Sequence, residues 1–517
     1  MNAVQRLERA GDAAIGLLGN RWFAALIIFF VLAMVVLDDP AADPDMFARV
    51  AVGRLVERDG GVSRTDPFAY TPKHDHWVDH EWLTGVVLWD VARTAGDRGL
   101  LLLALACMAA TVMLVAAGQL RFDGKAQGAG AWLFLCLAPL PWVWESVVRS
   151  HVFTYVLLPL FVLALVEYRR RRDPRVLVPL PLLMLFWANA HGGFVLGIGF
   201  LGLTALAATV EDRRFALPLW IATIACVLVT LVNPYGVDYW VYLREALTMD
   251  RSPYITEWRP LIYSPKLVPW VVAVTIPWVA WVVRRLGETP RRLPPEAVLL
   301  PAVSLVFALR STRLTVAYLL VLAVYGAPAL APVAARFRAG LRALPPEWLR
   351  SAAIVLVPAL LSLGLPVARA ALGPAGARLT YDRYPVAALE WLRESRPGGD
   401  VLVEFVRGSY ALWRLHPQFR VSIDGRYEEV YPQATFDVVK LALDPGAEGH
   451  EEAFRSVRPD YIVLESDAPA LDRPELFGPD WTIAYRDSAF AILESGGDGS
   501  PPASSPSSIL PVWEPLF

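Results

Sequence analysis

The stretch "DDPAADPDMFARVAVGRLVERDGG" (residues 38–61) ends an apolar run that extends from Phe23 to Leu37. Four aspartates fall within eight positions around two prolines, at Asp38, Asp39, Asp43 and Asp45. The residues after them have the pattern of a short amphipathic helix. Acid side chains directly after an apolar segment form either a solvated helix cap or an active site at a membrane surface, and the rest of the chain decides between the two.

The composition is that of a polytopic membrane protein. Of 517 residues, 55% are apolar and 19% are charged, and the mean hydropathy is +0.41. The apolar residues come in runs with the charge between them. The net charge of −2 gives no indication of nucleic acid as a partner. The three cysteines all lie inside apolar runs, which leaves no disulfide framework and no CxxC motif.

Apolar runs near the length of a spanning helix predict about eleven or twelve spans, mostly α-helical, in a membrane domain over 1–370. The candidates are 22–38, 99–118, 130–146, 152–168, 176–190, 193–210, 215–232, 267–284, 296–310, 313–330 and 351–368. We interpret 80–96 as an interfacial helix, because a twelfth span there would reverse every later helix.

Basic clusters give the orientation. With eleven spans and a cytoplasmic N-terminus, the positive-inside rule places all of them in the cytoplasm. They are 121–125, 169–173, 211–214, 284–292 and 336–342. The same register puts a first outer loop, 38–98, and the whole region after about 369 on the other side.

The region after 369 changes character. Short strand-like runs such as "YIVLE" (461–465) alternate with helical patterns such as "PVAALEWLRES" (385–395). This alternation predicts a small extracytoplasmic α/β domain over 371–495. The Gly/Ser/Pro-rich stretch that follows predicts a disordered tail, 496–517.

Ionisable and polar residues collect on the predicted outer side, where positive charge is not needed for topology. The first loop contributes Asp43, Asp45, His80 and Glu81. Later connections contribute Arg149, His151, Asn189, His191, Arg310 and Arg313.

Several of these residues also have a purely structural interpretation. Asp43 before Pro44 has the pattern of a helix N-cap, and Asp45 suits the positive end of the helix dipole. Asp45 and Arg49 have the spacing of an i, i+4 ion pair. His191 can serve as a helix-end residue, and the two late arginines can extend to the interface. A cap also fixes a carboxylate in place, so these roles are compatible with chemistry.

Taken together, the outer residues suit sugar transfer from a lipid phosphate. An acid of the first loop supplies a general base for an acceptor hydroxyl. Arginines hold a phosphate and stabilise the charge that develops on it. The surrounding bilayer admits the lipid tail.

The acidic motif after the first span resembles the GT-C class of integral-membrane glycosyltransferases. The similarity is to the protein O-mannosyltransferase and aminoarabinose-transferase branch, whose spacing is matched by Asp43, Phe47, Ala51 and Gly60. Pro44 replaces the second acid of that motif, and the acid reappears at Asp45. The segments "DPDMF", "TDPFAYT", "WVDHEWL", "WANAHGGF" and "IDGRYEEVYP" also resemble an uncharacterised family of bacterial membrane proteins over nearly the full length.

The resemblance implies an inverting transferase of the bacterial inner membrane, with a polyprenyl-phosphate-linked sugar as donor and an extracytoplasmic hydroxyl as acceptor. A first-loop Asp is the implied base. The motif spacing points to Asp43, whereas helix geometry leaves Asp45 freer, so both stay candidates. The resemblance requires no cofactor; for a divalent cation, the expected ligands are Asp43, Asp45, His80 and Glu81.

Two other functions remain open from the sequence. A transporter or flippase of a lipid-linked saccharide would place charges near the bilayer midplane on broken helices in paired halves. A non-catalytic protein of envelope assembly would tolerate replacement of Asp43 and Asp45.

Overall fold

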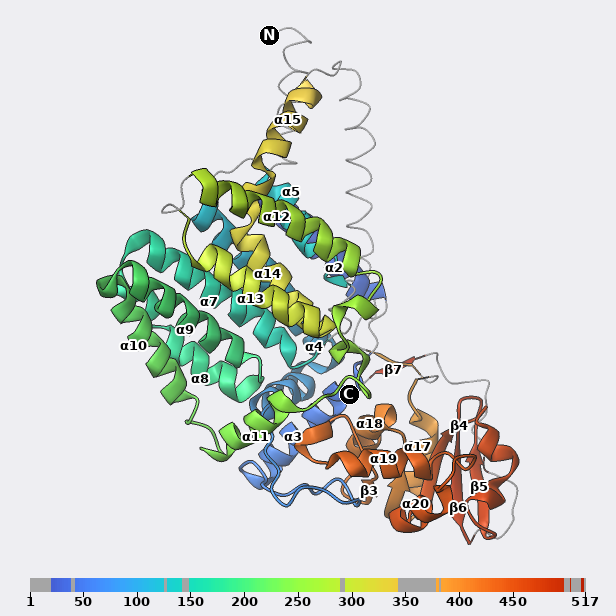
Figure 1. Ribbon diagram of the computed structural model, residues 1–517. Coiled ribbons are helices and arrows are strands. Elements are labelled where there is room, and N and C mark those ends of the chain that lie inside the picture. The colour runs from blue at the N-terminus through green and yellow to red at the C-terminus, as the bar shows by residue number, and fades with distance from the viewer. Residues whose placement is uncertain are drawn as a thin grey trace.

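The computed structural model describes residues 20–38, 42–124, 128–141, 148–288, 293–342, 378–380, 383–496, 503 and 513–515. Figure 1 shows a helical bundle, formed by the first two thirds of the chain, beside a smaller α/β part at the C-terminal end. The helix α3 lies at their junction. The predicted span 351–368 lies outside the described residues.

The bundle is built from helices that occupy ten of the eleven predicted spans. The α-helices are α2 (Arg21–Asp38), α3 (Pro44–Asp59), α4 (Trp82–Asp123), α5 (Ala129–Leu137), α7 (His151–Arg171), α8 (Leu180–Ala190), α9 (Phe194–Glu211), α10 (Arg213–Val229), α11 (Asp238–Thr248), α12 (Val268–Glu288), α13 (Glu296–Arg310), α14 (Thr315–Tyr325) and α15 (Ala331–Arg342). Short 3₁₀ turns join them: η1 (Pro174–Leu177), η2 (Thr256–Trp258), η3 (Leu261–Tyr263), η5 (Thr312–Leu314) and η6 (Ala327–Leu330).

Within the described residues, fewer helices than predicted are long enough to cross a bilayer alone. Four qualify by length and composition, α4, α7, α9 and α12. A fifth is formed if Thr312–Tyr325 and Ala327–Arg336, bent by 65°, count as one span. Helices α2 and α10, with 18 and 17 residues, are at the lower limit of the roughly 17–25 residues that a span needs, and the others are shorter. These helices make the chain a multi-pass membrane protein of mostly helical fold.

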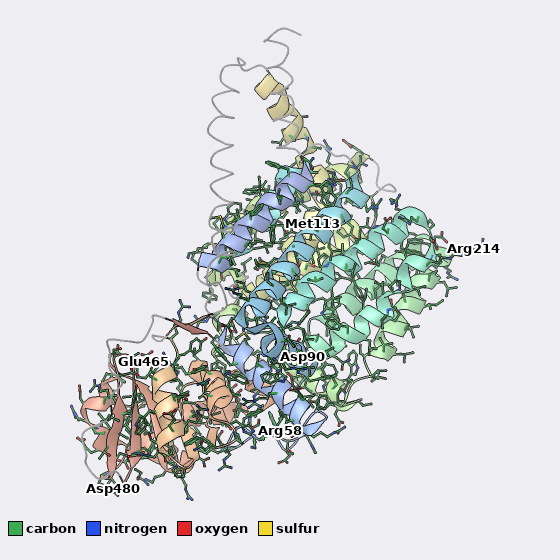
Figure 2. All side chains as sticks on the ribbon, turned by 180° about the vertical axis from the view of Figure 1, so that it is seen from behind. Arg58, Asp90, Met113, Arg214, Glu465 and Asp480 are labelled. Carbon is green, nitrogen blue, oxygen red and sulfur yellow. The ribbon has the colours of Figure 1, made fainter. Side chains whose placement is uncertain are left out.

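Helix α10 shows the lipid-facing surface. Leu217, Ile221, Ile224 and Leu228 follow one another at helical spacing, and each is 56–60% exposed. Water would disfavour such a continuous apolar stripe, whereas lipid tails accept it. Figure 2 shows the same bundle from behind, with Met113 on the face toward the viewer. Arg214 lies at the outer edge of the bundle, far from Glu465 and Asp480 of the α/β part.

Ion pairs show that charged helix ends gather at one end of the bundle. Arg21 pairs with Asp123 at 2.8 Å, Arg169 pairs with Glu296 at 2.7 Å, and Arg121 pairs with Glu167 at 3.0 Å. These residues lie at or near an end of α2, α4, α7 or α13. The basic segments around 121–125 and 169–173 therefore share one end, and the first loop lies at the opposite end.

The segment 80–96 is not a separate span, and most of it forms the first of two helical parts that meet at a kink. Helix α4 begins at Trp82 and continues through it, but Gly96 departs from helical geometry with φ 59° and ψ −156°. This break separates a first part that carries the exposed Asp90 and Arg93 from the apolar part that can cross the membrane. The first part packs against α3, so 80–96 forms no separate twelfth span, as predicted.

The C-terminal part is a mixed sheet with helices. Its five-stranded sheet has the order β3-β2-β4-β6-β5. Strand β2 is parallel to its neighbours β3 and β4. Strand β6 is antiparallel to its neighbours β4 and β5. The strands are β2 (Gly399–Leu402), β3 (Phe419–Val421), β4 (Tyr461–Glu465), β5 (Trp481–Arg486) and β6 (Phe490–Ser495). The helices are α17 (Val386–Ser395), α18 (Phe405–Leu415), α19 (Gln433–Ala442) and α20 (His450–Val457), with the turns η7 (Tyr427–Glu429), η8 (Pro469–Asp472) and η9 (Pro474–Leu476).

Most of the predicted disordered stretch lies outside the described residues. The exceptions are Ala503, which bridges to Tyr485, and β7 (Trp513–Pro515), which pairs antiparallel with β1 (Arg378–Thr380).

The first loop joins the edge of this sheet. The backbone N–H of Val421 donates to Phe68 O at 2.9 Å, and Tyr70 N–H donates to Val421 O at 3.2 Å. Strand β3 is the edge of the five-stranded sheet, so the loop extends the sheet by a short parallel bridge. The C-terminal part is therefore built onto the first loop.

Candidate functional site

The N-terminus of α3 carries the first-loop acids. Asp43 is its N-cap, Pro44 is the first helical residue, and the Asp43 side chain accepts a hydrogen bond from Asp45 N–H. The N···O distance is 3.0 Å. Gly60 ends the helix in the left-handed conformation at φ 71°. The predicted cap is confirmed, and it holds the Asp43 carboxylate in one position.

The guanidinium of Arg149 pairs with both acids. We call the group of residues around it the acid–arginine network (Asp43, Asp45, Arg149, Glu257 and Arg313). Arg149 Nε lies 3.3 Å from Asp43 Oδ1, a terminal nitrogen pairs with Asp45, and the other lies 3.3 Å from Glu257 Oε2. Glu257 continues to Arg313 at 2.5 Å. The network connects α3, the turn before α7, and the turns η2 and η5.

The environment of Asp43 changes its acidity. Burial raises its pKa, Arg149 opposes this, and the nearby Asp45 raises it further, with a result of about 7. For Glu257, by contrast, Arg313 and Arg149 outweigh burial and hold its pKa below the usual range. Asp43 thus has the acidity expected of a general base that works near neutral pH.

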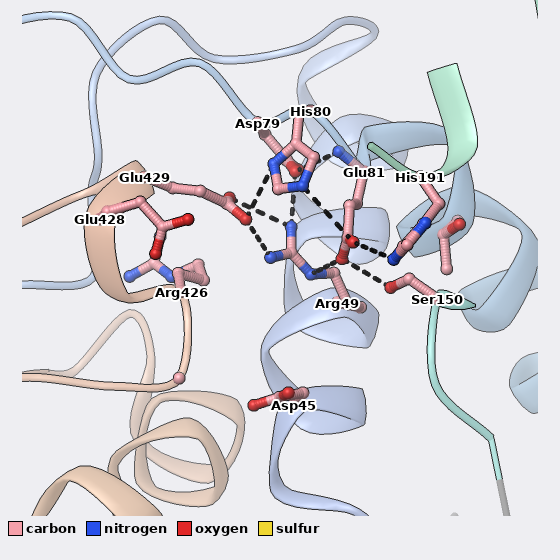
Figure 3. A network of polar contacts seen from close by, with 12 residues as sticks. Asp45, Arg49, Asp79, His80, Glu81, Ser150, His191, Arg426, Glu428 and Glu429 are labelled. Carbon is pink, nitrogen blue, oxygen red and sulfur yellow. Dashed lines mark hydrogen bonds and ion pairs between the residues drawn. The ribbon is translucent and has the colours of Figure 1, made fainter. Parts of the chain in front are cut away.

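A second cluster lies one helical turn further along α3 (Figure 3). This histidine–glutamate network contains Arg49, Asp79, His80, Glu81, Ser150, His191 and Glu429. Arg49 contacts Asp79 at 2.6 Å, Glu81 at 3.0 Å and Glu429 at 2.5 Å. The predicted Asp45–Arg49 ion pair is wrong, because Asp45 pairs with Arg149 and Arg49 turns to these three carboxylates.

Glu81 accepts from several donors at once. Ser150 Oγ donates to it at 2.6 Å, and Arg49 and the rings of His80 and His191 lie within 3.0–3.6 Å. Although burial opposes ionisation, Arg49 and the two rings hold the pKa of Glu81 well below its usual range. Glu81 is therefore an ionised acceptor rather than a proton-accepting base.

Hydrogen bonds determine the tautomer of His191. Its Nδ1 accepts from Gly193 N–H at 2.9 Å and lies 2.8 Å from Thr154 Oγ1. An acceptor Nδ1 leaves the proton of the neutral ring on Nε2, which points toward Glu81. Burial lowers the pKa of His191 to about 3, in agreement with a neutral ring.

The C-terminal part reaches both networks through its segment 424–429, and it supplies Glu429 to the histidine–glutamate network. Glu429 pairs with Arg49 and lies 3.1 Å from His80 Nδ1. A Cβ at Gly425 would lie 2.5 Å from Asp45 Oδ1, so a larger residue there would make the Asp45 side chain shift. Arg426 is buried and forms two ion pairs, one with Asp424 at 2.7 Å and one with Asp66 of the first loop at 2.5 Å. This segment forms a wall of the site.

Three predicted site residues lie outside the two networks. The Asn189 amide accepts from Trp82 Nε1 and donates to the carbonyls of Leu185 and Val232, which gives it a structural role beside an apolar groove of 510 Å³. His151 is buried with its ring against Tyr155, and its Nε2 has no hydrogen-bond partner among the described residues. Arg310 is exposed at the end of α13.

The four expected cation ligands do not come together. Asp43 and Asp45 belong to one network, and His80 and Glu81 to the other. His80, Glu81 and Glu429 are close enough to hold one ion. However, the two nitrogens of His80 face different carboxylates, and Arg49 already pairs with both glutamates.

The sequence marks Glu257 as one of the polar residues of the outer side but not as a site residue, and it does not single out Glu429. Glu257 lies in a polar outer connection, and Glu429 in the "IDGRYEEVYP" segment, but neither has local spacing that connects it to α3. Glu429 is 380 positions from its partner Arg49. Only the fold brings such residues together.

This arrangement, an acid-capped helix at one end of a membrane bundle, belongs to a GT-C-like glycosyltransferase fold, and the resemblance seen in the sequence is confirmed at this level. The chain is similar in fold to a solved structure of the archaeal oligosaccharyltransferase AglB from Archaeoglobus fulgidus. Its complex with an inhibitory peptide and a dolichol-phosphate is 12% identical, with a TM-score of 0.53, over 86% of this chain and 69% of that one.

Two further structures, both of an Archaeoglobus fulgidus oligosaccharyltransferase, are similar to the same extent. The apo form is 11% identical over 92% of this chain and 75% of that one, with a TM-score of 0.53. The form tethered to an acceptor peptide is 12% identical over 86% and 69%, with a TM-score of 0.52. No protein-family description and no curated protein matches the chain in sequence. Identities this low show the fold alone.

Proposed function

We propose that the protein transfers a sugar from a polyprenyl-phosphate donor to an acceptor hydroxyl on the extracytoplasmic side of a bacterial inner membrane. The observation that carries this proposal is the acid–arginine network: an acid pair at a helix N-terminus, held by Arg149, at one end of a GT-C-like bundle. One of the matching structures holds a dolichol-phosphate, which supports a lipid phosphate as the leaving group.

In this reaction Asp43 accepts the proton of the acceptor hydroxyl. The hydroxyl oxygen bonds to the anomeric carbon of the sugar, and the bond from that carbon to the phosphate oxygen breaks on the opposite face, which inverts the configuration. The electron pair leaves with the polyprenyl phosphate. Arg313, whose ion pair with Glu257 uses one nitrogen, and His151, whose Nε2 is unpaired among the described residues, stabilise that charge.

Asp43 has priority over Asp45 as the base. The Asp43 side chain is 11% exposed, against 36% for Asp45, and burial brings its pKa to about 7. Asp45 lies closer to the C-terminal part and contacts Gly425. We therefore assign Asp45 to orientation of Arg149 and of the acceptor.

The proposal is tested with the full chain in lipid nanodiscs, radiolabelled polyprenyl-phosphate sugars and envelope extract as acceptor. Asp43→Asn should lower transfer by about 10²-fold or more, the range for loss of a general base. The control Asp59→Asn lies in the same helix but pairs only with the exposed Arg58, and it should keep the wild-type rate. Full transfer by a well-folded Asp43→Asn protein would contradict the mechanism.

A further inference from the structure

The guanidinium of Arg149 has one carboxylate at each of its three nitrogens. Asp43 faces Nε and Glu257 faces a terminal nitrogen, each at 3.3 Å. Asp45 pairs with the other terminal nitrogen. The carboxylates come from parts of the chain more than 200 positions apart, and the Arg149 side chain is only 15% exposed. Arg149 is the centre of a three-carboxylate site.

Three converging carboxylates need a cation. A divalent ion would draw their oxygens into a shell of roughly 2.0–2.6 Å around one point. The planar fork of arginine instead holds its partners apart, each on its own nitrogen. In the parts of the chain that the structure describes, the trio close enough for a single ion is His80, Glu81 and Glu429, and it excludes Asp43 and Asp45. The acid pair has the spacing that suits a guanidinium.

The charges of the network agree with this interpretation. Three carboxylates face two guanidiniums, because Arg313 also pairs with Glu257 at 2.5 Å. An arginine keeps its charge throughout the physiological pH range. The network thus carries a fixed positive centre, bound to the chain, beside the proposed base.

We propose that Arg149 is the resident cation of this site and that it takes the place of a divalent metal at the acid pair. The inference rests on the proposed function, for which it specifies that transfer needs no metal there. Arg149 acts as a positioning residue: it holds the carboxylates of Asp43 and Asp45 in place and offsets their charge.

The first experiment measures transfer by the full chain after treatment with a chelator. Wild-type transfer should stay within about twofold, because the positive centre is covalent, and Arg149→Ala should lose about 100-fold or more. Methylguanidinium should restore part of the activity of Arg149→Ala but none of that of Asp43→Asn. The control Arg64→Ala removes an exposed arginine whose nearest carboxylate is at 3.7 Å, and it should be unaffected.

Arg149→Lys tests whether misfolding explains the loss of activity in Arg149→Ala, since lysine keeps the positive charge but lacks the planar set of donors. It should fold and remain well below the wild-type rate. Wild-type transfer that is abolished by chelation and restored by Mn²⁺ would overturn the proposal, as would full activity of Arg149→Lys.

A second measurement does not depend on activity. Electron paramagnetic resonance of Mn²⁺ titrated into the wild type and Asp45→Asn should give the same bound fraction, because no ion uses the acid pair. A wild-type Mn²⁺ signal that disappears in Asp45→Asn would overturn the proposal even if no sugar donor supports transfer. Absence of transfer with an unchanged Mn²⁺ signal would instead count against the proposed function.

Discussion

The two acids at the start of α3 have different environments although only Pro44 separates them. Asp43 caps the helix with a carboxylate that is mostly buried, while Asp45 is more exposed and contacts the C-terminal part. A helix N-terminus stabilises both negative charges. Burial acts on Asp43 in the opposite direction and raises its pKa to about 7.

This difference predicts a pH dependence. Because only the ionised carboxylate accepts a proton, kcat/KM for transfer should rise with pH and level off above about 7, the pKa of Asp43. Asp45→Asn removes a neighbouring negative charge that raises this pKa. The rise should therefore move to lower pH while the plateau persists. Initial rates across roughly pH 5 to 9 test this, and a plateau lost in Asp45→Asn but kept in Asp43→Asn would make Asp45 the base.

Local pattern predicted the residues that act within one helix turn and missed those that act across the fold. The Asp-Pro pair identified the cap at Asp43, because capping depends on neighbours in sequence. Helical spacing predicts an ion pair between Arg49 and Asp45, yet Arg49 lies near His80 (Figure 3) and pairs with Glu429. Sequence spacing carries no information about which of several carboxylates a long side chain reaches.

At the scale of elements, the crossing of α3 and the first part of α4 positions both networks. It depends on two glycines in direct contact. A Cβ on Gly53 would lie 2.1 Å from the Gly85 carbonyl oxygen, and one on Gly85 would lie 2.7 Å from the Arg49 carbonyl oxygen. Backbone atoms cannot move aside as side chains can, so the helices touch only because both residues lack a Cβ.

We expect Gly53→Ala to force the two helices apart. The free energy of unfolding should fall by about 1–3 kcal/mol, the usual range for overpacking, and transfer should fall with it. Thermal unfolding in detergent measures the first effect. The control Gly199→Ala lies in α9 with open space around it, where alanine should be neutral or stabilising by up to about 1 kcal/mol. Equal unfolding temperatures for the two variants would contradict this account of the crossing.

The elements of the C-terminal part were predicted more accurately than those of the bundle. Strand β4 matches its predicted range, and α17 begins one residue later than predicted, because turns and polar residues separate these short elements. The bundle helices consist mainly of apolar residues, so length is the main feature that separates spans from short helices. That is why the segment 176–190, in which α8 has 11 residues, is predicted as a span.

For the whole molecule, the ion pairs define two ends, and the proposed orientation assigns a compartment to each. A cysteine introduced for the exposed Glu451 of the C-terminal part should react with a membrane-impermeant maleimide in intact cells. One introduced for the exposed Arg213, in a basic connection, should react only after permeabilisation. The native cysteines are buried and give little background. The reverse labelling pattern would show that the topology is inverted and that the site faces the cytoplasm.

The bridge between the first loop and the sheet edge has a consequence for biosynthesis. Asp66 and Arg426 are 360 positions apart in the chain, so at roughly 5–20 residues per second the ribosome needs on the order of 20 to 70 s to make the second partner after the first. During that interval the first loop lacks the strand edge at Val421 to pair with, and Arg49 lacks Glu429, one of its three carboxylate partners. A chain that stops before 420 would therefore hold every residue of the acid–arginine network but not the sheet edge that the first loop joins.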